Sequence, residues 1–558
     1  MSASVDLDAG PARREHPAAP LDRVLAPLHR SSVAVDLVLA TLTVVVGTAL
    51  RFTQDDAFIT LRYSRNLAEG NGLVYNLGER VEGYTNFLWT AFLALPFRLD
   101  VDPVLWSDVA SIAAGVVTVL ATRRLARRLL DSDRYATVAA LLLVGFHSFA
   151  IYLTGGLETQ WQTMFVVLVA LALVPGLDEP LPVARLTAAS AFAGLACLTR
   201  LDSAVLLVAI GVPVARALHR RGELGSSRVA AALAPATALL VPWLAWKWGY
   251  YDALLPNTFV AKQTPILWAV GRGLFFLVLF VVVTFLFIAL PLTRPGWVGL
   301  RSRPGTRWAL GIVGLWVLYL LYVGADFMEF RFLVPVLPLV MVLVTATLPA
   351  LPERRELVVI AVIAVGSLAK WALFYPAVVG IESARALEDH VTDPAGWREA
   401  GEVLRADFPE GEQDGPTLAI TAAGALPFFA QLRTIDMLGL TDVGANEFRW
   451  ELTKLKAGHE HIATIDYLVE REVDLVIGGV VVEPCEEVAD IDRLDVIRRM
   501  YLTYDVPPSE LPTGSRLVSI PLRSRDRCLL ALDLSTGERR DRIDRQGYAE
   551  LPLDDLRR

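Results

Sequence analysis

Long apolar runs recur over the first two thirds of the chain and alternate with short polar loops. The first run, 31–50, is about as long as the hydrocarbon core of a bilayer requires, and Arg51 follows it in place of a small-residue cleavage site. An uncleaved membrane span is therefore expected there. Ten further runs have the same character and lie at 104–122, 135–153, 161–176, 183–199, 202–218, 228–249, 267–293, 307–323, 332–350 and 356–375. The pattern predicts a polytopic α-helical membrane protein with about 11 transmembrane helices.

One further run, 84–99, is short and has polar residues near both ends. The distribution of arginine decides whether it crosses, because cytoplasmic loops of membrane proteins are enriched in basic residues. If 84–99 stays at the outer interface, every basic cluster that follows falls on the inside. These clusters are 123–128, 219–221, 294–307 and 354–355. We therefore expect a cytoplasmic N-terminus and a first outer loop, 51–103, that carries interfacial helices.

Composition supports this class and divides the chain into three regions. Hydrophobic residues make up 54% of the sequence, too many for a soluble protein of this length. Residues 1–30 are rich in Ala, Pro and Arg without apolar periodicity and are expected to be a disordered cytoplasmic tail. Residues 31–375 form the membrane domain, and 376–558 change in pattern.

The region 376–558 alternates helix and strand signals. A helical spacing of apolar residues covers 394–408, and short apolar runs at 417–423, 473–479, 516–522 and 528–534 are typical of strands. The alternation predicts an α/β domain outside the cell. Cys485 and Cys528 both fall within it, so a disulfide is expected there, with two unpaired thiols as the alternative. The absence of CxxC and Cys/His clusters argues against structural zinc.

The expected topology gathers the polar motifs on one side of the membrane. The outer loops then hold QDDAFITLRY (54–63), TGGLETQW (154–161), TRLDS (199–203), YYDALLPNTFVAKQ (250–263) and GADFMEFRF (324–332). Polar groups at a membrane boundary are costly to desolvate and are often functional. This arrangement predicts one site on the outer side.

Asp55 and Asp56 open the first of these motifs. Neighbours in a helix do not share a face, so one acid can point into a cleft while the other is held by donors or a cation. A carboxylate in that cleft can act as a general base toward a hydroxyl group. The alternative is an N-cap of the helix that follows.

Cations and aromatic residues accompany the acid pair. Arg62, Lys262 and Arg331 could together bind an anionic headgroup, and Arg65 follows Arg62 closely. Nonspecific contact with lipid headgroups remains an alternative. Aromatic residues at the same level could stack on a sugar or form an interfacial belt. These are Tyr84, Trp89 and Trp161.

The remaining polar candidates each have two interpretations. Glu158 and Asp326 could bind acceptor hydroxyls or a metal, or could cap the spans that follow them. Arg200 could contact substrate or simply pair with Asp202. His147 is expected to be a packed polar residue inside a span, and His459 and His461 are expected on the surface.

Taken as a set, these motifs resemble a known enzyme family. DDAFITLRY followed by GNGLVYNLGERVEGYTNFLW resembles the first outer loop of the GT-C superfamily, which takes sugars from polyprenyl-phosphate donors. TGGLET, LTRLD, YYDALLPNTFVAK, GADFMEFRF and TIDMLGLTD are similar to one branch of that superfamily. The branch includes the actinobacterial terminal β-1,2-arabinofuranosyltransferases that cap cell-wall arabinan. The likeness extends over most of the chain.

The resemblance implies roles for particular residues. One of Asp55 and Asp56 would be catalytic, with Asp55 favoured because the first acid is usual in the superfamily. Arg62, Lys262 and Arg331 would hold the donor phosphate. A divalent cation (Mg²⁺, Mn²⁺ or Ca²⁺) near the acids is a further expectation. Substrate contacts are expected from Tyr84, Asn86, Trp89, Glu158, Arg200, Asn257 and Asp326.

The expected function is transfer of a sugar, arabinofuranose first, from a polyprenyl phosphate to a cell-envelope polysaccharide at the plasma membrane. A GT-C mannosyltransferase or another hexosyl- or pentosyltransferase is an alternative within the same fold. A sugar-lipid transporter or flippase is the alternative of another class. It would be expected to carry charges deep within its spans and to show two related halves.

Overall fold

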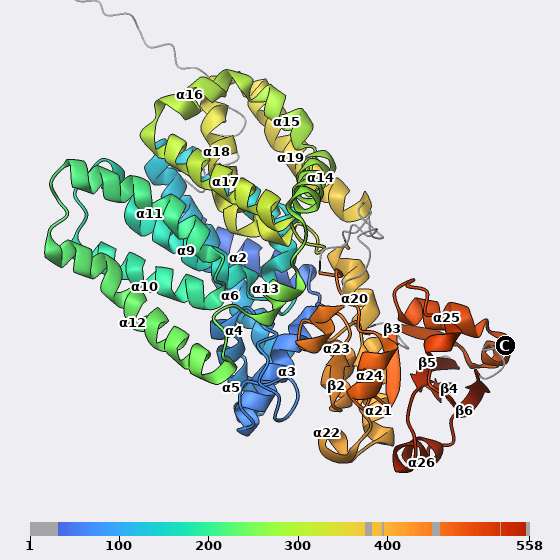
Figure 1. Ribbon diagram of the computed structural model, residues 1–558. Helices are drawn as coiled ribbons and strands as arrows, with labels where there is room; N and C mark the ends of the chain where they lie inside the picture. The colour runs from blue at the N-terminus through green and yellow to red at the C-terminus, as the bar shows by residue number, and fades with distance from the viewer. Residues whose placement is uncertain (1–31, 374–381, 393–395, 449–457, 525, 554–558) are drawn as a thin grey trace, which may run out of the picture.

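The protein is a bundle of long helices with a smaller sheet domain at one end (Figure 1). The computed structural model describes residues 32–373, 382–392, 396–448, 458–524 and 526–553. The expected tail, 1–30, lies outside the described residues. Helices form most of the chain before residue 373, and all six strands come after residue 417.

Among the described residues, eight helical segments are long and apolar enough to cross a membrane, and a ninth is added if one bent pair counts as a span. The bent pair joins α7 (Asp133–Gly145) to His147–Leu153 at 66°. Two further predicted runs lie on α10 (Val183–Thr199) and α19 (Glu353–Leu373). The eight are α2 (Ser32–Ala49), α6 (Pro103–Leu130), Thr159–Leu177 beginning with α9 (Thr159–Leu173), α11 (Ser203–Arg220), α12 (Ser226–Tyr251), α14 (Ile266–Val283), α17 (Pro304–Val323) and Arg331–Ala350 containing α18 (Leu337–Thr347). The predicted polytopic helical class is confirmed, and the described part of every predicted run overlaps one or more helices.

Two apolar runs differ from single straight helices. The run 267–293 is broken, because α14 ends at Val283 and α15 (Leu286–Leu292) begins after Phe285, which has a φ of 57°. The expectation of one continuous helix there is wrong. The short run 84–99 forms α4 (Phe87–Phe92) and α5 (Ala94–Leu99). Each is about 9 Å long, too short to cross a hydrocarbon core of about 30 Å.

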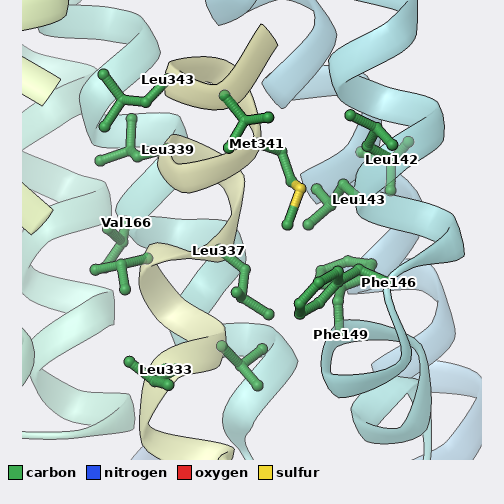
Figure 2. Close-up of a cluster of buried hydrophobic side chains, with 14 of the residues drawn as sticks. Leu142, Leu143, Phe146, Phe149, Val166, Leu333, Leu337, Leu339, Met341 and Leu343 are labelled. Atoms are coloured by element: carbon green, nitrogen blue, oxygen red, sulfur yellow. The ribbon is translucent and has the colours of Figure 1, made fainter. Parts of the chain in front are cut away.

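The centre of the bundle is α18, which is apolar on all sides. Its span is 78% buried, whereas that of α12 is only 6% buried. Leu337, Leu339 and Met341 of α18 pack with Leu143 and Phe149 of the bent pair (Figure 2). A helix that is apolar all round and enclosed by others belongs to the core, while the exposed apolar surface of α12 suits contact with lipid.

Ion pairs connect the helices at the end of the bundle that lies opposite the sheet domain. Arg123 of α6 contacts Asp36 of α2 and Asp133 of α7, each at 2.8 Å. Arg134 reaches Glu356 of α19 at 3.0 Å. The predicted cytoplasmic position of this end stays a prediction, because the arrangement of helices carries no direction across a membrane.

The C-terminal domain contains a six-stranded sheet in the order β2-β1-β3-β5-β4-β6. Its first half is parallel, and its second half is antiparallel. Alternate residues of β3 enter different cores, since Leu475 and Ile477 pack on one face and Val476 on the other. The predicted α/β character is confirmed. The strands are β1 (Leu418–Ile420), β2 (Thr434–Asp436), β3 (Leu475–Pro484), β4 (Arg516–Pro521), β5 (Arg527–Asp533) and β6 (Ala549–Pro552).

Short helices complete the two regions. In the helical part these are α3 (Asp55–Glu69), α8 (His147–Ala150), α13 (Asn257–Ala261) and α16 (Trp297–Ser302). In the C-terminal domain these are α20 (Ala384–Thr392), α21 (Trp397–Asp407), α22 (Gly411–Asp414), α23 (Ala425–Ala430), α24 (Ile465–Glu470), α25 (Arg493–Met500) and α26 (Glu538–Asp544).

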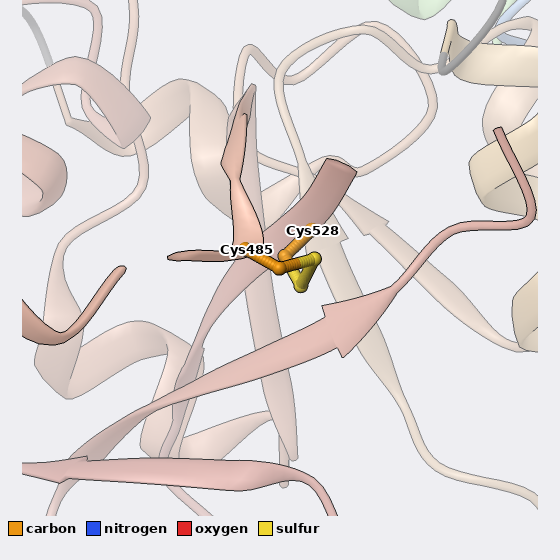
Figure 3. The surroundings of a disulfide bond; sticks show 2 residues. All are labelled: Cys485 and Cys528. Carbon is orange, nitrogen blue, oxygen red and sulfur yellow. A yellow bond between two sulfur atoms is a disulfide. The ribbon is translucent and has the colours of Figure 1, made fainter. Parts of the chain in front are cut away.

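A disulfide joins the two halves of the sheet. It links Cys485, directly after β3, to Cys528 of β5 (Figure 3). Cys197 on α10 is buried and carries a free thiol.

The sidedness of the bundle can be tested with two added cysteines. Asn71 and Ser227 are exposed at opposite ends of the bundle, and the native cysteines are buried or paired. We expect Asn71→Cys to react with an impermeant thiol reagent on intact cells and Ser227→Cys to react only after permeabilisation. The reverse pattern would overturn the predicted orientation. Gly155 is unsuitable for this experiment, because a side chain there would meet the Phe52 ring.

Candidate active site

The acid pair lies in the first turn of α3, at the end of the bundle that faces the C-terminal domain. Thr53 pairs with Gly155 in an isolated parallel bridge, which aligns the start of α3 with the loop 154–158. Gly155 and Gly156 have φ values of 94° and 77°. At Gly156 a side chain would collide with Ala57 of α3, so this glycine allows the loop and the helix to touch.

The two acids have different surroundings. Asp55 is 6% exposed, and its Oδ1 accepts a hydrogen bond from the backbone N–H of Ala425 at 2.6 Å. Asp56 is only half-buried. Gln54 is the N-cap residue of α3 and makes no side-chain cap, and Asp55 and Asp56 lie in the first turn of the helix. One acid is held by a donor of the C-terminal domain, and the other is partly open.

A buried polar cluster lies beside this turn. Glu158 accepts from Asn86 at 2.9 Å and pairs with Arg200 at 2.7 Å. Arg200 also pairs with Asp202 at 2.6 Å. Burial opposes ionisation of Glu158, but Arg200 and Arg331 outweigh it and hold the pKa of Glu158 below its ordinary value. Asn86, Glu158 and Arg200, all expected at the substrate site, are thus brought together by direct contacts.

Arg331 and Asp326 form a second buried pair. Their closest nitrogen and oxygen atoms are 2.8 Å apart, and both residues follow α17 in the loop that leads into α18. The Nε atom of Arg331 is buried and has no hydrogen-bond partner in the described part of the chain. A buried donor of this kind is costly unless an acceptor reaches it.

Arg62 is placed differently from the expectation. Its guanidinium is 1% exposed, and all three nitrogens donate to protein acceptors. The acceptors come from the first loop and from the C-terminal domain. They are Tyr75 O, Asn76 Oδ1, Glu412 Oε2, Pro427 O and Leu432 O. Because these groups occupy the guanidinium, the placement does not support a phosphate-binding role for Arg62.

Lys262 is placed at the junction between the bundle and the C-terminal domain. It is half-buried and follows α13, and its side chain makes no hydrogen bond or ion pair to the described residues. A side chain at Gly458 of the C-terminal domain would touch its Cε atom at 3.4 Å. Asn257, at the start of α13, donates to Gly439 O and Leu440 O at 2.8 and 3.1 Å. Asn257 therefore anchors the segment that carries Lys262.

The aromatic candidates are packing residues. Trp89 is fully buried and donates to Gly156 O at 2.9 Å, and Trp161 donates to Ala110 O at 3.3 Å. Tyr84 is buried, and its hydroxyl lies 3.2 Å from that of Tyr251. The interpretation of Trp89 and Tyr84 as an exposed interfacial belt is wrong, because both side chains lie inside the protein.

The surroundings of His147, His459 and His461 differ. His147 is buried against Glu329 and Lys370 at 3.0 and 3.2 Å, which agrees with a packed polar residue. His459 is half-buried and contacts the ring of Phe327. The expectation of a surface position is wrong for His461, which is buried and has Nδ1 3.2 Å from Phe448 O.

Two buried lysines were not recognised as part of this region. Lys247 of α12 pairs with Glu82 at 2.7 Å, and Lys370 of α19 pairs with Glu329 at 2.5 Å. Lysine inside an apolar run is a signal that a partner must exist, although the partner itself lies far away in the sequence. Burial raises the pKa of Glu82 to about 7, with Lys247 opposing that shift.

The expected divalent cation has no ready ligand set. Within the described ranges, no group of three or more His, Cys, Asp and Glu side chains gathers as a metal site. Asp55 already accepts from Ala425. The divalent cation expected near Asp55 and Asp56 stays a prediction.

Solved structures share this architecture. ArnT from Cupriavidus metallidurans bound to undecaprenyl phosphate aligns with a TM-score of 0.57, covering 91% of this chain and 100% of ArnT at 13% identity. The arabinofuranosyltransferase AftD from Mycobacteria aligns with a TM-score of 0.50, covering 93% of this chain and 40% of AftD at 15% identity. The chain has the GT-C fold.

Sequence comparisons are consistent with that fold. Residues 89–246 match the family model of dolichyl-phosphate-mannose-protein mannosyltransferases, and 385–520 match a domain of unknown function, DUF8728. The terminal β-(1→2)-arabinofuranosyltransferase of Corynebacterium glutamicum is 31% identical over 344 residues, 53% of this GT-C chain and 48% of that protein. That of Mycobacterium tuberculosis is 31% identical over 227 residues, 38% of this chain and 35% of that protein. The chain thus matches half or less of the length of these relatives.

Replacing Arg62 tests whether this residue docks the C-terminal domain. Arg62→Met leaves several buried acceptors unpaired, so we expect a loss of about 3 kcal/mol or more in unfolding free energy. Arg98→Met is the control, since Arg98 is exposed, and should stay within about 0.5 kcal/mol. Thermal unfolding in detergent measures both. Unchanged stability in Arg62→Met, with weakened binding of a lipid phosphate, would instead restore the phosphate role.

The raised pKa of Glu82 predicts a pH dependence of stability. The folded protein holds this proton more tightly than the unfolded chain, so the contribution is complete below pH about 4.5 and lost as pH rises toward 7. Relative to Glu82→Gln, wild type should lose up to roughly 3 kcal/mol of stability over that window. Unfolding of both proteins is measured at a series of pH values. A difference that stays constant with pH would contradict the assignment.

Proposed function

We propose that this GT-C protein transfers a sugar, arabinofuranose first, from a polyprenyl phosphate to a cell-envelope glycan on the outer face of the plasma membrane. The observation that carries the proposal is the convergence of separate polar motifs beside the acid pair. Thr53 pairs with Gly155, Glu158 contacts both Asn86 and Arg200, and Arg331 pairs with Asp326. The arabinofuranosyltransferase names of the relatives support the choice of sugar.

Asp56 is assigned as the carboxylate that takes the proton of the acceptor hydroxyl. It is half-buried at the start of α3, whereas Asp55 is buried against Ala425. During transfer the bond between the anomeric carbon and the phosphate oxygen breaks, and a bond from that carbon to the acceptor oxygen forms. The acceptor proton passes to Asp56, and the polyprenyl phosphate leaves with the electron pair.

Lys262 and Arg331 are assigned to the departing phosphate. Lys262 is the half-buried cation without a partner among the described residues, and Arg331 keeps a buried Nε–H without an acceptor. Positive charges placed where negative charge develops stabilise the transition state more than the ground state. The prenyl chain would remain among the spans, so no nucleotide is needed outside the cell.

The position of the buried charges weighs against a transporter. Lys247 lies four residues before the end of α12, within about 6 Å of that helix end. A transporter would be expected to place charge near the bilayer midplane. Mannose is kept as the second candidate sugar, because 89–246 match the mannosyltransferase family model.

The decisive measurement is transfer by purified protein. Radiolabelled polyprenyl-phosphate arabinofuranose and polyprenyl-phosphate mannose are offered with arabinan and mannan oligosaccharides. We expect labelled product from wild type with the arabinose donor. Asp56→Asn should lower kcat by about 10²–10⁴-fold, the range typical of losing a general base. Asp55→Asn should retain transfer, since its amide oxygen can still accept from Ala425.

Matched controls separate the outcomes. Asp100→Asn removes an exposed carboxylate of the same first loop at a φ of 54°, which asparagine tolerates, and should behave as wild type. Equal loss in Asp55→Asn and Asp56→Asn, with unchanged unfolding temperatures, would return the catalytic role to Asp55. Wild type without product from either donor, but with labelled sugar-lipid moved across vesicles, would replace the enzyme by a transporter.

A further inference from the structure

The C-terminal domain contacts α3 on several successive turns. Phe428 packs on Phe58, with ring centroids 5.3 Å apart, and Pro427 O accepts from Arg62 at 3.0 Å. Arg65, one turn further along, donates to Phe428 O at 3.1 Å. The segment around α23 therefore contacts successive turns of the helix that begins with the acid pair.

The closest contact is at the acid pair itself. Ala425 donates to Asp55 Oδ1 at 2.6 Å, and the preceding residue is Gly424. A methyl group at Gly424 would lie 2.6 Å from the carboxyl carbon of Asp55 and nearer still to the backbone carbonyl oxygen of Asp55. That carbonyl belongs to the peptide bond joining Asp55 to Asp56. Gly424 thus rests directly against the link between the two acids.

The other side of α23 is also closely packed. Gly401 of α21 has no side chain. A methyl group added there would lie 2.5 Å from Leu426 O of α23. Since α23 is pressed between α21 and α3, it has little room to yield. A displacement at the Gly424 contact would therefore pass to the start of α3.

We propose that the C-terminal domain positions the acid pair, and that Gly424 is a positioning residue for sugar transfer. The inference rests on the proposed function. Gly424 touches the peptide of the acids and acts through Asp56, without contact to substrate. Asp55 acts in the same way, by holding the N–H of Ala425. A domain outside the membrane thereby completes a site that is built on a membrane-domain loop.

This role predicts a specific kinetic pattern. The cations assigned to the donor phosphate, Lys262 and Arg331, lie on other segments than α3 and α23. Displacing the acid pair should therefore lower kcat with little change in the KM for the donor. A shift of about 1 Å in a reacting group can cost about 10²-fold in rate.

The test compares two glycine substitutions in the full-length protein. We expect Gly424→Ala to lower kcat at least tenfold, while the donor KM stays within about twofold. The variant Gly479→Ala is the matched control, because its methyl group would lie 2.8 Å from Arg499 O of α25 and 3.2 Å from Leu502 Cδ2, away from α3. It should lower the unfolding temperature as Gly424→Ala does and leave kcat within about twofold. Asp55→Ala, which removes the acceptor for Ala425, should lower kcat, and Asp55→Asn should restore it.

Each outcome has a defined meaning. A normal kcat in Gly424→Ala, or equal losses of kcat in both glycine variants, would overturn the positioning role while leaving the proposed transfer intact. If Gly424→Ala does not fold, the Asp55→Ala and Asp55→Asn comparison decides in its place. Wild type inactive with every donor would overturn the proposed function and the positioning role together.

Discussion

Burial of the Arg62 guanidinium is the constraint on which the arrangement of the two domains depends. A charge removed from water is tolerated only when its donors are satisfied, and here they reach acceptors in both the first loop and the C-terminal domain. Neither region alone supplies enough of them. The membrane bundle and the sheet domain are thus joined through a polar centre that excludes water. The contacts of Ala425 with Asp55 and of Asn257 with Gly439 and Leu440 lie in the same junction.

The hydrophobic pattern was sufficient to predict the helical class. Every helix that crosses the hydrocarbon core of a bilayer needs a long apolar run, so the spans can be recognised directly in the sequence. The break at Phe285 could not be predicted, because 267–293 is apolar throughout and its backbone turn is decided by neighbouring helices. The strands of the C-terminal domain were found where apolar runs were clear. The three-residue strand β2 was missed because so short a run carries little signal.

The individual roles of the polar residues were harder to predict than their placement in one region of the protein. Arg62 and Lys262 look equivalent in sequence, yet one is saturated by protein acceptors and the other has none among the described residues. Trp89 is likewise engaged by the protein, because its indole N–H donates to Gly156 O. Such roles depend on partners up to hundreds of positions away, and no local pattern records them. The resemblance supplied candidate residues, and the contacts show which of them are engaged by other protein groups.

The mixed sheet of the C-terminal domain has a consequence for how this protein can vary. Its parallel half is followed by the segments that meet the bundle, including α23 after β1 and the residues 439–446 after β2. Its antiparallel half is attached through the β3–β5 ladder, whose register shifts between Val476 and Val481, and through the disulfide of Cys485 and Cys528. The strands of the antiparallel half are thus attached to the parallel half, and the parallel half is followed by the segments that meet the bundle. Changes in the antiparallel half can therefore be accommodated without displacing the segments that contact the bundle.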